Sequence, residues 1–348
     1  MTVLYSIIHM LVDGMCALAM FGNFVNDEKG YFYFLIYNFC AFALQMPIGA
    51  LQDMLNLWYK EKQKEYTLCF VILGVGFTAL GAMTHPIVLG IGNALFHIGG
   101  GVGAIREDEA KGWQGRGLGI FVAPGAFGLY VGTLIAKKGV WKGGILVAIC
   151  LTVGLTVVAA VLHKRKPYVM KTINRHKKEM SQSGCALLGI SCFFVVILRS
   201  YIGMAVAMPW KQIPILGLIS VLAVVCGKAA GGFWAARLGY GRTAGITLLL
   251  AALAYLGLEL APFGIFALFA FNMTMPMTLY LLIRALPQLP GFSFGMLTFG
   301  LFLGFLPAYF GWQTGWSSQV TGALGSILSM VILGLGIWQG GKHVSVSD

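Results

Sequence analysis

Charged residues are scarce in this sequence, since aspartate, glutamate, lysine and arginine together make up only 10% of its 348 residues. Soluble proteins carry about 25% of these residues, and a globular fold leaves much of its surface in contact with water. The chain is also 58% hydrophobic, with a mean hydropathy of +0.82. The shortage of charge therefore excludes an ordinary soluble domain and indicates an integral membrane protein.

Acidic residues are the scarcer kind, with 12 against 24 basic residues and a formal net charge of +12. In a soluble protein such an excess raises the question of nucleic-acid binding. Here the basic residues stand between apolar runs, which is the pattern of membrane proteins. We therefore expect these basic residues to lie at the surface of a lipid bilayer, and we expect no nucleic-acid partner.

Motifs for metal binding and membrane-enzyme chemistry are also missing. None of the seven cysteines forms a C-x-x-C pair or another metal-ligand spacing, so we interpret them as small packing residues. There is no H-E-x-x-H motif either. An integral membrane enzyme would need a convergent catalytic set, for which His9 and Asp13 are the only candidates. The sequence therefore predicts no metal site, no cofactor and no enzyme activity.

What the sequence does contain is a series of long apolar runs. A helix needs about 20 mostly apolar residues to cross a membrane. Twelve runs meet this length, near residues 2–24, 30–51, 66–84, 86–105, 115–136, 140–162, 184–207, 212–236, 242–260, 262–283, 290–310 and 317–339. The sequence thus predicts an all-α integral membrane protein with twelve transmembrane helices.

The lysines and arginines predict the orientation of these helices. With a cytoplasmic N-terminus, seventeen of them fall in inner loops and five in outer loops. Inner loops of membrane proteins carry the excess of basic residues. We therefore predict a multi-pass protein of the cell membrane with both termini in the cytoplasm.

A polar and basic stretch, residues 163–183, divides the spans into six and six. It predicts an N-terminal six-helix bundle over 1–162, a cytoplasmic linker over 163–183 and a C-terminal six-helix bundle over 184–348. The basic side chains of the linker are expected to face anionic lipid headgroups. Two parallel halves of this kind are typical of secondary transporters.

Two loops support the idea of a repeat. Residues 49–53 end the second span and residues 232–242 end the eighth. Both resemble G-x-x-x-D-R-x-G-R-R, the signature that major facilitator transporters carry after their second and eighth helices. The departures from the signature are Met54, Asn56 and Ala236. In that family the loop is a cytoplasmic latch, so the resemblance implies gating roles for Asp53, Arg237 and Arg242.

Further stretches resemble one branch of this family. Residues 90–97, GIGNALFH, and Arg199 in the seventh span are similar to the fosmidomycin-resistance transporters, although Ile98 replaces the proline of their fourth-helix motif. Residues 119–128 resemble the fifth-helix motif of proton antiporters. The resemblance implies the major facilitator fold and proton-coupled efflux of an anionic, phosphonate-like solute.

Four ionisable residues are expected at membrane depth, where a charge costs at least about 2.5–3.5 kcal/mol. His9 and Asp13 are four residues apart and share a helix face, so they form either a proton-carrying site or a structural pair. His97 stands among glycines and is either a ligand contact or a buried structural histidine. Arg199 cannot lose its proton, so it either anchors an anion or neutralises Asp13.

These residues together predict a secondary active transporter that moves a small anionic or zwitterionic solute by alternating access. Protons are the expected coupling ion, the expected direction is efflux, and the protein is expected to be a monomer. The predicted substrate-binding and proton-coupling residues are His9, Asp13, Asn38, His97, Arg199 and Asn272. The alternatives are a hydrophobic drug or lipid exporter of the same fold and, less favoured, an integral membrane enzyme.

Overall fold

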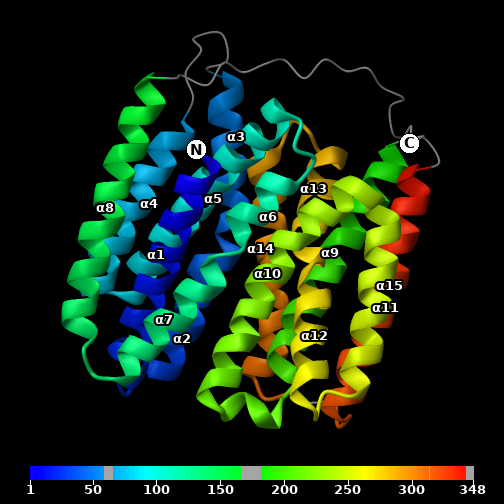
Figure 1. Ribbon diagram of the computed structural model, residues 1–348. Coiled ribbons are helices and arrows are strands. Elements are labelled where there is room, and N and C mark those ends of the chain that lie inside the picture. The colour runs from blue at the N-terminus through cyan, green and yellow to red at the C-terminus, as the bar shows by residue number, and fades with distance from the viewer. Residues whose placement is uncertain (59–65, 166–181, 313, 342–348) are drawn as a thin grey trace. The chain divides into compact units, whose positions relative to one another are not determined.

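The computed structural model describes residues 1–58, 66–165, 182–312 and 314–341 (Figure 1). All regular elements among these residues are helices. The longer ones are α1 (Thr2–Gly22), α2 (Gly30–Asn38), α3 (Gln45–Trp58), α4 (Thr67–Met83), α5 (Pro86–Lys111), α6 (Arg116–Val122), α7 (Gly125–Lys137), α8 (Trp141–Arg165), α9 (Gln182–Ala205), α10 (Pro214–Leu238), α11 (Tyr240–Leu256), α12 (Ala261–Asn272), α13 (Thr274–Ala285), α14 (Pro290–Tyr309) and α15 (Ser318–Gly341). Short helical turns are η1 (Phe24–Asn26), η2 (Phe39–Ala43) and η4 (Pro209–Gln212).

The helices account for the twelve predicted spans. In the described part of the chain, ten helical stretches are long and apolar enough to cross a membrane, and α4 and α11 are shorter apolar helices. Each of these twelve stretches coincides with one predicted run. The prediction of an all-α membrane protein with twelve helices is therefore confirmed.

Three of the spans are interrupted. The second span contains the π-helical turn η2, the fifth is divided into α6 and α7, and the tenth into α12 and α13. Proline has no N–H and cannot bond to the carbonyl four residues earlier. The prolines at these places are Pro47, Pro124 and Pro276. The interruptions therefore follow from the sequence, and they free backbone carbonyls for other donors.

Glycines allow neighbouring helices to approach closely. A methyl group on Gly128 of α7 would overlap the carbonyl of Met10, and one on Gly132 would overlap the carbonyl of Gly14. Both of these carbonyls belong to α1. Small residues at such crossings stabilise helix pairs in a membrane, where burial of apolar surface adds little. The glycine-rich composition thus has a direct structural use in the packing of α1 against α7.

The helices form two compact units. The first contains Met1–Lys111, Ile120–Val169 and Gln288–Phe299, and the second contains Gly112–Gly119, Met170–Pro287 and Gly300–Asp348. The predicted bundles over 1–162 and 184–348 stay a prediction. Most of the predicted linker, residues 166–181, lies outside the described residues.

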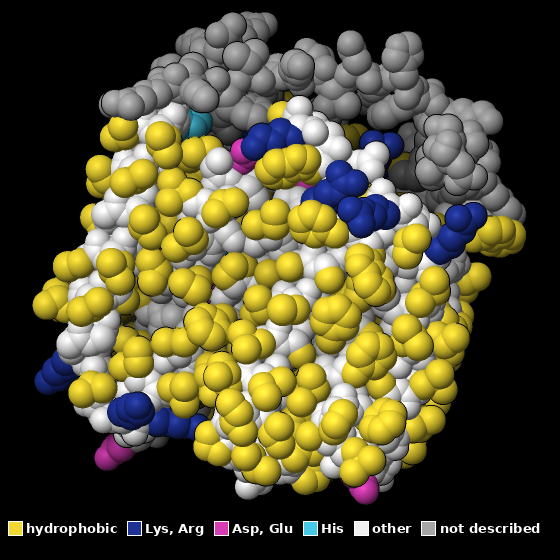
Figure 2. Space-filling model, in the orientation of Figure 1, with side chains coloured by type: hydrophobic (Ala, Val, Ile, Leu, Met, Phe, Trp, Pro, Cys, Tyr) yellow, Lys and Arg dark blue, Asp and Glu magenta, His cyan; other side chains and the backbone are white. Residues whose placement is uncertain are grey.

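The surface is apolar where lipid is expected. Hydrophobic side chains cover most of the visible face, and lysines and arginines gather near its ends (Figure 2). Along α8, for example, Leu146, Val147, Leu151 and Val157 are all more than half exposed. Such a band suits the hydrocarbon core of a bilayer. The chain is therefore a multi-pass integral membrane protein, while the choice of membrane and the cytoplasmic position of the termini stay predictions.

Candidate functional site

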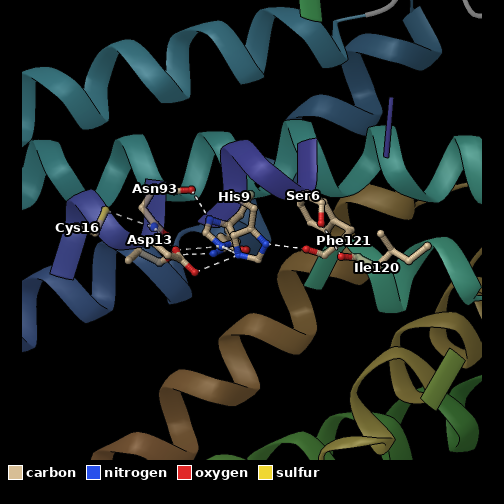
Figure 3. Close-up of polar contacts among 10 residues, drawn as sticks. Ser6, His9, Asp13, Cys16, Asn93, Ile120 and Phe121 are labelled. Atoms are coloured by element: carbon tan, nitrogen blue, oxygen red, sulfur yellow. Dashed lines mark hydrogen bonds and ion pairs between the residues drawn. The ribbon is translucent and has the colours of Figure 1, made fainter. Parts of the chain in front are cut away.

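His9 and Asp13 meet on one face of α1, as their spacing predicts. The Nε2 atom of His9 lies 3.1 Å from Oδ2 of Asp13, and both residues are buried (Figure 3). Residues four apart lie one above the other on a helix. The contact is therefore built into the sequence of α1.

A third residue, His97 on α5, completes this group. Its Nε2 atom lies 2.9 Å from Nε2 of His9 and 3.6 Å from Oδ1 of Asp13. The two imidazole rings pack edge to face, with centroids 4.5 Å apart. We call His9, Asp13 and His97 the His–Asp cluster.

The break between α6 and α7 orients the ring of His9. Because α6 ends at Val122, the carbonyls of Ile120 and Phe121 have no partner within the helix. Two side chains of α1 bond to them instead: the Ser6 hydroxyl donates to Ile120 O at 2.6 Å, and His9 Nδ1 lies 2.8 Å from Phe121 O (Figure 3). A carbonyl oxygen only accepts hydrogen bonds. Nδ1 of His9 therefore carries a proton.

The same reasoning fixes the proton of His97. Its Nδ1 atom lies 2.9 Å from the carbonyl oxygen of Asn93, one turn earlier on α5. With both Nδ1 atoms protonated, the Nε2 atoms of the two neutral rings have only lone pairs. These lone pairs face one another and the carboxylate of Asp13. In this tautomer the His–Asp cluster brings the acceptor atoms of three side chains to one point.

Asn93 and two aromatic rings surround the cluster. The Asn93 side-chain amide donates to Oδ1 of Asp13 at 3.1 Å and approaches the Cys16 sulfur at 3.5 Å (Figure 3). The ring of Phe121 stacks on His9 with centroids 5.0 Å apart, and Phe96 packs edge to face on His97 at 5.8 Å. These apolar walls strengthen electrostatic interactions within the cluster, because they keep bulk water away.

Gly125 closes the remaining side of the cluster. A Cβ atom at this position would lie 2.5 Å from Oδ2 of Asp13 and 2.5 Å from Nε2 of His9. Both distances are far shorter than van der Waals contact. The first residue of α7 must therefore be glycine for His9 and Asp13 to keep their positions.

We expect Gly125→Ala to displace the His–Asp cluster and to destabilise the protein by about 1–3 kcal/mol, as overpacking of a filled core does. Gly154→Ala on α8 is the matched control, because a Cβ atom there has open space around it. The measurement is thermal unfolding of both variants in detergent. Equal unfolding temperatures for the two variants and the wild type would contradict the steric role of Gly125.

Asp53, a predicted gating residue, bonds to the N-terminus of α14. This helix is far from Asp53 in the sequence but belongs to the same unit at this end. The buried Asp53 carboxylate accepts hydrogen bonds from the backbone N–H groups of Gly291, at 3.0 Å, and Phe292, at 2.8 Å. These groups belong to the first turn of α14, where helical N–H groups lack internal partners. A methyl group on Gly49 would overlap the carbonyl of Gly291, so the glycine of the motif permits this approach.

We expect Asp53→Ala to lower the free energy of unfolding by about 1–2 kcal/mol, because two N–H groups of α14 lose their acceptor. Asp53→Asn keeps one oxygen and is expected to cost less. Glu28→Gln, at an exposed acid, controls for the loss of a charge. The measurement is denaturant unfolding of the three variants. Equal stability of Asp53→Ala and Glu28→Gln would contradict the capping role of Asp53.

The second copy of the motif has a different local role. Arg237 and Arg242 are exposed, and Gly239 between α10 and α11 has φ = 87°. A positive φ is easily adopted only by glycine, which commonly ends helices in this way. The glycine of this motif thus makes the turn between α10 and α11. The gating roles of the two arginines stay predictions.

Asn38 and Asn272 each bond to their own helix. The Asn38 amide donates to Phe34 O at 2.7 Å, and the Asn272 amide donates to Leu268 O at 2.9 Å. Both residues stand next to the interruptions described above. Bonding of this kind is a local structural interaction, and their role in lining a pore stays a prediction.

Arg199 lies buried on α9 in the second unit. Among the described residues its Nη1 atom has no hydrogen-bond partner. In the described part of the second unit the only acidic residue is Glu259, which is exposed and accepts a hydrogen bond from Gln319. The unit therefore contains no acid of its own, among the residues described, that neutralises this guanidinium. A buried charge in this situation is costly.

Several features of the site were not predicted from the sequence. The spacing of Asn93 and His97, four residues apart, would have placed both on one face of α5. The consecutive Pro124 and Gly125 would have indicated a helix break with close packing. The meeting of His9 with His97 has no signal in a single sequence, because 88 positions separate them.

Comparison with known proteins supports the fold. No protein-family model and no curated protein matches this sequence. Among solved structures, the E. coli fucose:proton symporter FucP aligns with a TM-score of 0.63 and 12% identity over 97% of each chain. The human organic anion transporter MFSD10 aligns with a TM-score of 0.63 and 12% identity over 95% of this chain and 98% of that chain. A bacterial homologue of the iron transporter ferroportin aligns with a TM-score of 0.53 and 13% identity over 98% of each chain. The chain therefore has a fold like that of the major facilitator transporters, as predicted, and the resemblance to the fosmidomycin-resistance branch stays a prediction.

Proposed function

We propose that this protein is a secondary active transporter that moves a small anionic or zwitterionic solute across the membrane. Arg199 is its main electrostatic contact with the solute. The observation that carries the proposal is the buried Arg199 guanidinium, whose Nη1 atom has no partner among the described residues. An anion bound there would supply the missing acceptor and the opposite charge.

Guanidinium chemistry narrows the solute class. Its planar fork of N–H donors matches the oxygens of carboxylate, phosphate or phosphonate groups in pairs. It is always charged, so it cannot avoid the cost of burial by losing a proton. A solute carrying one of these groups therefore gains most from Arg199, whereas a neutral hydrophobic drug offers no acceptor to its Nη1 atom.

Coupling to a cation is the second part of the proposal. In the His–Asp cluster, the Nε2 atoms of His9 and His97 and the Asp13 carboxylate lie close together as hydrogen-bond acceptors. A cation bound among them would relieve the repulsion between their lone pairs. Histidine changes charge within the physiological pH range, which suits a proton as that cation. We propose proton-coupled efflux, the direction that the sequence resemblance implies, with Asp53 as part of a gate that opens during the cycle.

The structural neighbours are compatible with both parts. One is described as a fucose:proton symporter and another as an organic anion transporter. At 12% identity they share the fold with this chain, and their substrates are properties of those proteins. The choice of an anion here depends on Arg199.

A thermal-shift screen of the detergent-purified protein tests the proposal. We expect anionic metabolites and phosphonates to raise the unfolding temperature, because a ligand that binds only the folded state stabilises it. Hydrophobic drugs are the comparison set. Stabilisation by hydrophobic drugs alone would contradict the proposed solute class and favour a drug or lipid exporter.

A further inference from the structure

We infer that the His–Asp cluster is also a binding site for a divalent first-row transition-metal ion. The donor set is Nε2 of His9, Nε2 of His97 and the carboxylate of Asp13, whose ligand atoms all lie within 4.8 Å of one another. Imidazole nitrogen together with carboxylate oxygen is a set that suits ions such as Zn²⁺, Fe²⁺ and Co²⁺. Ca²⁺ and Mg²⁺ prefer sets made only of oxygen.

The distances between donor atoms suit one shared ion. Metal–nitrogen and metal–oxygen bonds of this class are about 2.0–2.2 Å long. Two donors at that distance are then about 3 Å apart when they subtend a right angle at the ion, and slightly farther apart in a tetrahedral site. The observed separations are 2.9 Å between the two Nε2 atoms, 3.1 Å from His9 to Oδ2 and 3.6 Å from His97 to Oδ1. All three are close to this range, and because the two histidines lie near different oxygens of Asp13, the ion would be shared by both carboxylate oxygens.

The surroundings of the ligands are those of a metal site. Histidines that bind metals usually donate their other ring N–H to a carbonyl or carboxylate, which fixes the ring and its tautomer. Here Nδ1 of His9 points at Phe121 O and Nδ1 of His97 at Asn93 O. Both Nε2 lone pairs are thereby directed into the cluster. The Asn93 amide in turn positions Asp13.

A fourth residue offers a further donor atom beside the cluster. The Asn93 side-chain Oδ1 is buried and has no hydrogen-bond partner among the described residues. The same amide donates from its nitrogen to Oδ1 of Asp13, so the Asn93 side chain borders the donor set. An unsatisfied buried acceptor is costly, and a cation nearby would offset part of this cost. The sequence predicts no metal site, because the ligands come from two helices and form no linear motif.

The test is a titration of the detergent-purified full-length protein with Co²⁺, after removal of any affinity tag and treatment with EDTA. We expect one Co²⁺ per chain, with visible absorption bands of a nitrogen- and oxygen-ligated ion that Zn²⁺ displaces. His97→Ala and Asp13→Asn should each weaken binding by about 100-fold or more, since loss of outer-shell partners alone costs about 10- to 100-fold. His85→Ala is the matched control, because His85 is an exposed histidine outside the cluster, and it should bind Co²⁺ like the wild type.

Asp13→Asn is nearly isosteric, so it tests the site even if His97→Ala does not fold. The inference is wrong if the wild type shows no saturable Co²⁺ binding at neutral pH, or if Asp13→Asn and His85→Ala bind Co²⁺ equally well. The titration contains no anionic solute and therefore reports on the cluster alone. Failure of metal binding would leave the anion-binding proposal standing, and loss of the anion-induced thermal shift would leave the metal site standing.

Discussion

Replacement of Arg199 by alanine is expected to abolish the thermal shift that anionic solutes produce in the wild type. A charge-assisted hydrogen bond from a buried donor contributes about 1.5–3 kcal/mol, which corresponds to about a 10- to 100-fold loss of affinity. Arg199→Lys keeps the charge but loses the paired donors, so it should bind more weakly than the wild type and more tightly than Arg199→Ala. The affinities are measured by titration calorimetry with the best anion from the screen.

Arg284→Ala is the matched control for this experiment, because Arg284 is an exposed arginine at the end of α13. It should bind the anion like the wild type. Unchanged affinity in Arg199→Ala would contradict the role of Arg199 as the main contact with the solute.

A competing account holds that Arg199 only neutralises Asp13. The contacts of Asp13 within its own unit are with His9, His97 and Asn93, so its charge already has partners. The account nevertheless makes a separate prediction. Arg199→Ala and Asp13→Asn would each destabilise the protein, and the double variant would recover both stability and anion binding. We expect no such recovery.

Asp13→Asn is the second variant with a large expected effect. It keeps the shape of the side chain but removes the negative charge that lies beside the two histidines. We expect accumulation of solute in proteoliposomes to lose its dependence on an imposed pH gradient, while binding of the solute persists. The measurement is solute flux with and without the gradient.

The exposed acid Asp27 provides the control, because Asp27→Asn removes a charge outside the cluster and should leave coupling intact. If Asp13→Asn responds to the pH gradient like the wild type, proton coupling lies elsewhere in the protein. The metal site would then be unaffected, since it is tested by direct titration.

The sequence predicted the fold well, for a physical reason. Each span must be apolar over the thickness of the bilayer, and this signal is local. The same holds for the pairing of His9 with Asp13, which depends only on helical periodicity. The second span, however, extends beyond residue 51, where consecutive polar residues first interrupt the apolar run, to Trp58 in α3. Hydropathy alone does not indicate where such a helix ends.

The rest of the site depends on contacts between helices. His97 reaches His9 because α1 and α5 pack together, and nothing in the local sequence fixes this pairing. The group of α6 that orients His9 is the backbone carbonyl of Phe121. A backbone carbonyl is present in every residue, so the sequence does not reveal this contact. The gating role of Asp53 stays a prediction from resemblance, and the two N–H groups of α14 that bond to its carboxylate have no signal in the sequence around it. Backbone partners of this kind are visible only in three dimensions.

Luminal pH in proteoliposomes distinguishes proton-coupled exchange from uncoupled transport of the anion. Protein is reconstituted with a pH-sensitive dye inside the vesicles, and the anion identified in the screen is added outside. If the protein exchanges anion for protons, the lumen becomes more alkaline with the wild type and not with Arg199→Ala or Asp13→Asn. Entry of the labelled anion with no change in luminal pH would contradict a proton-coupled transporter.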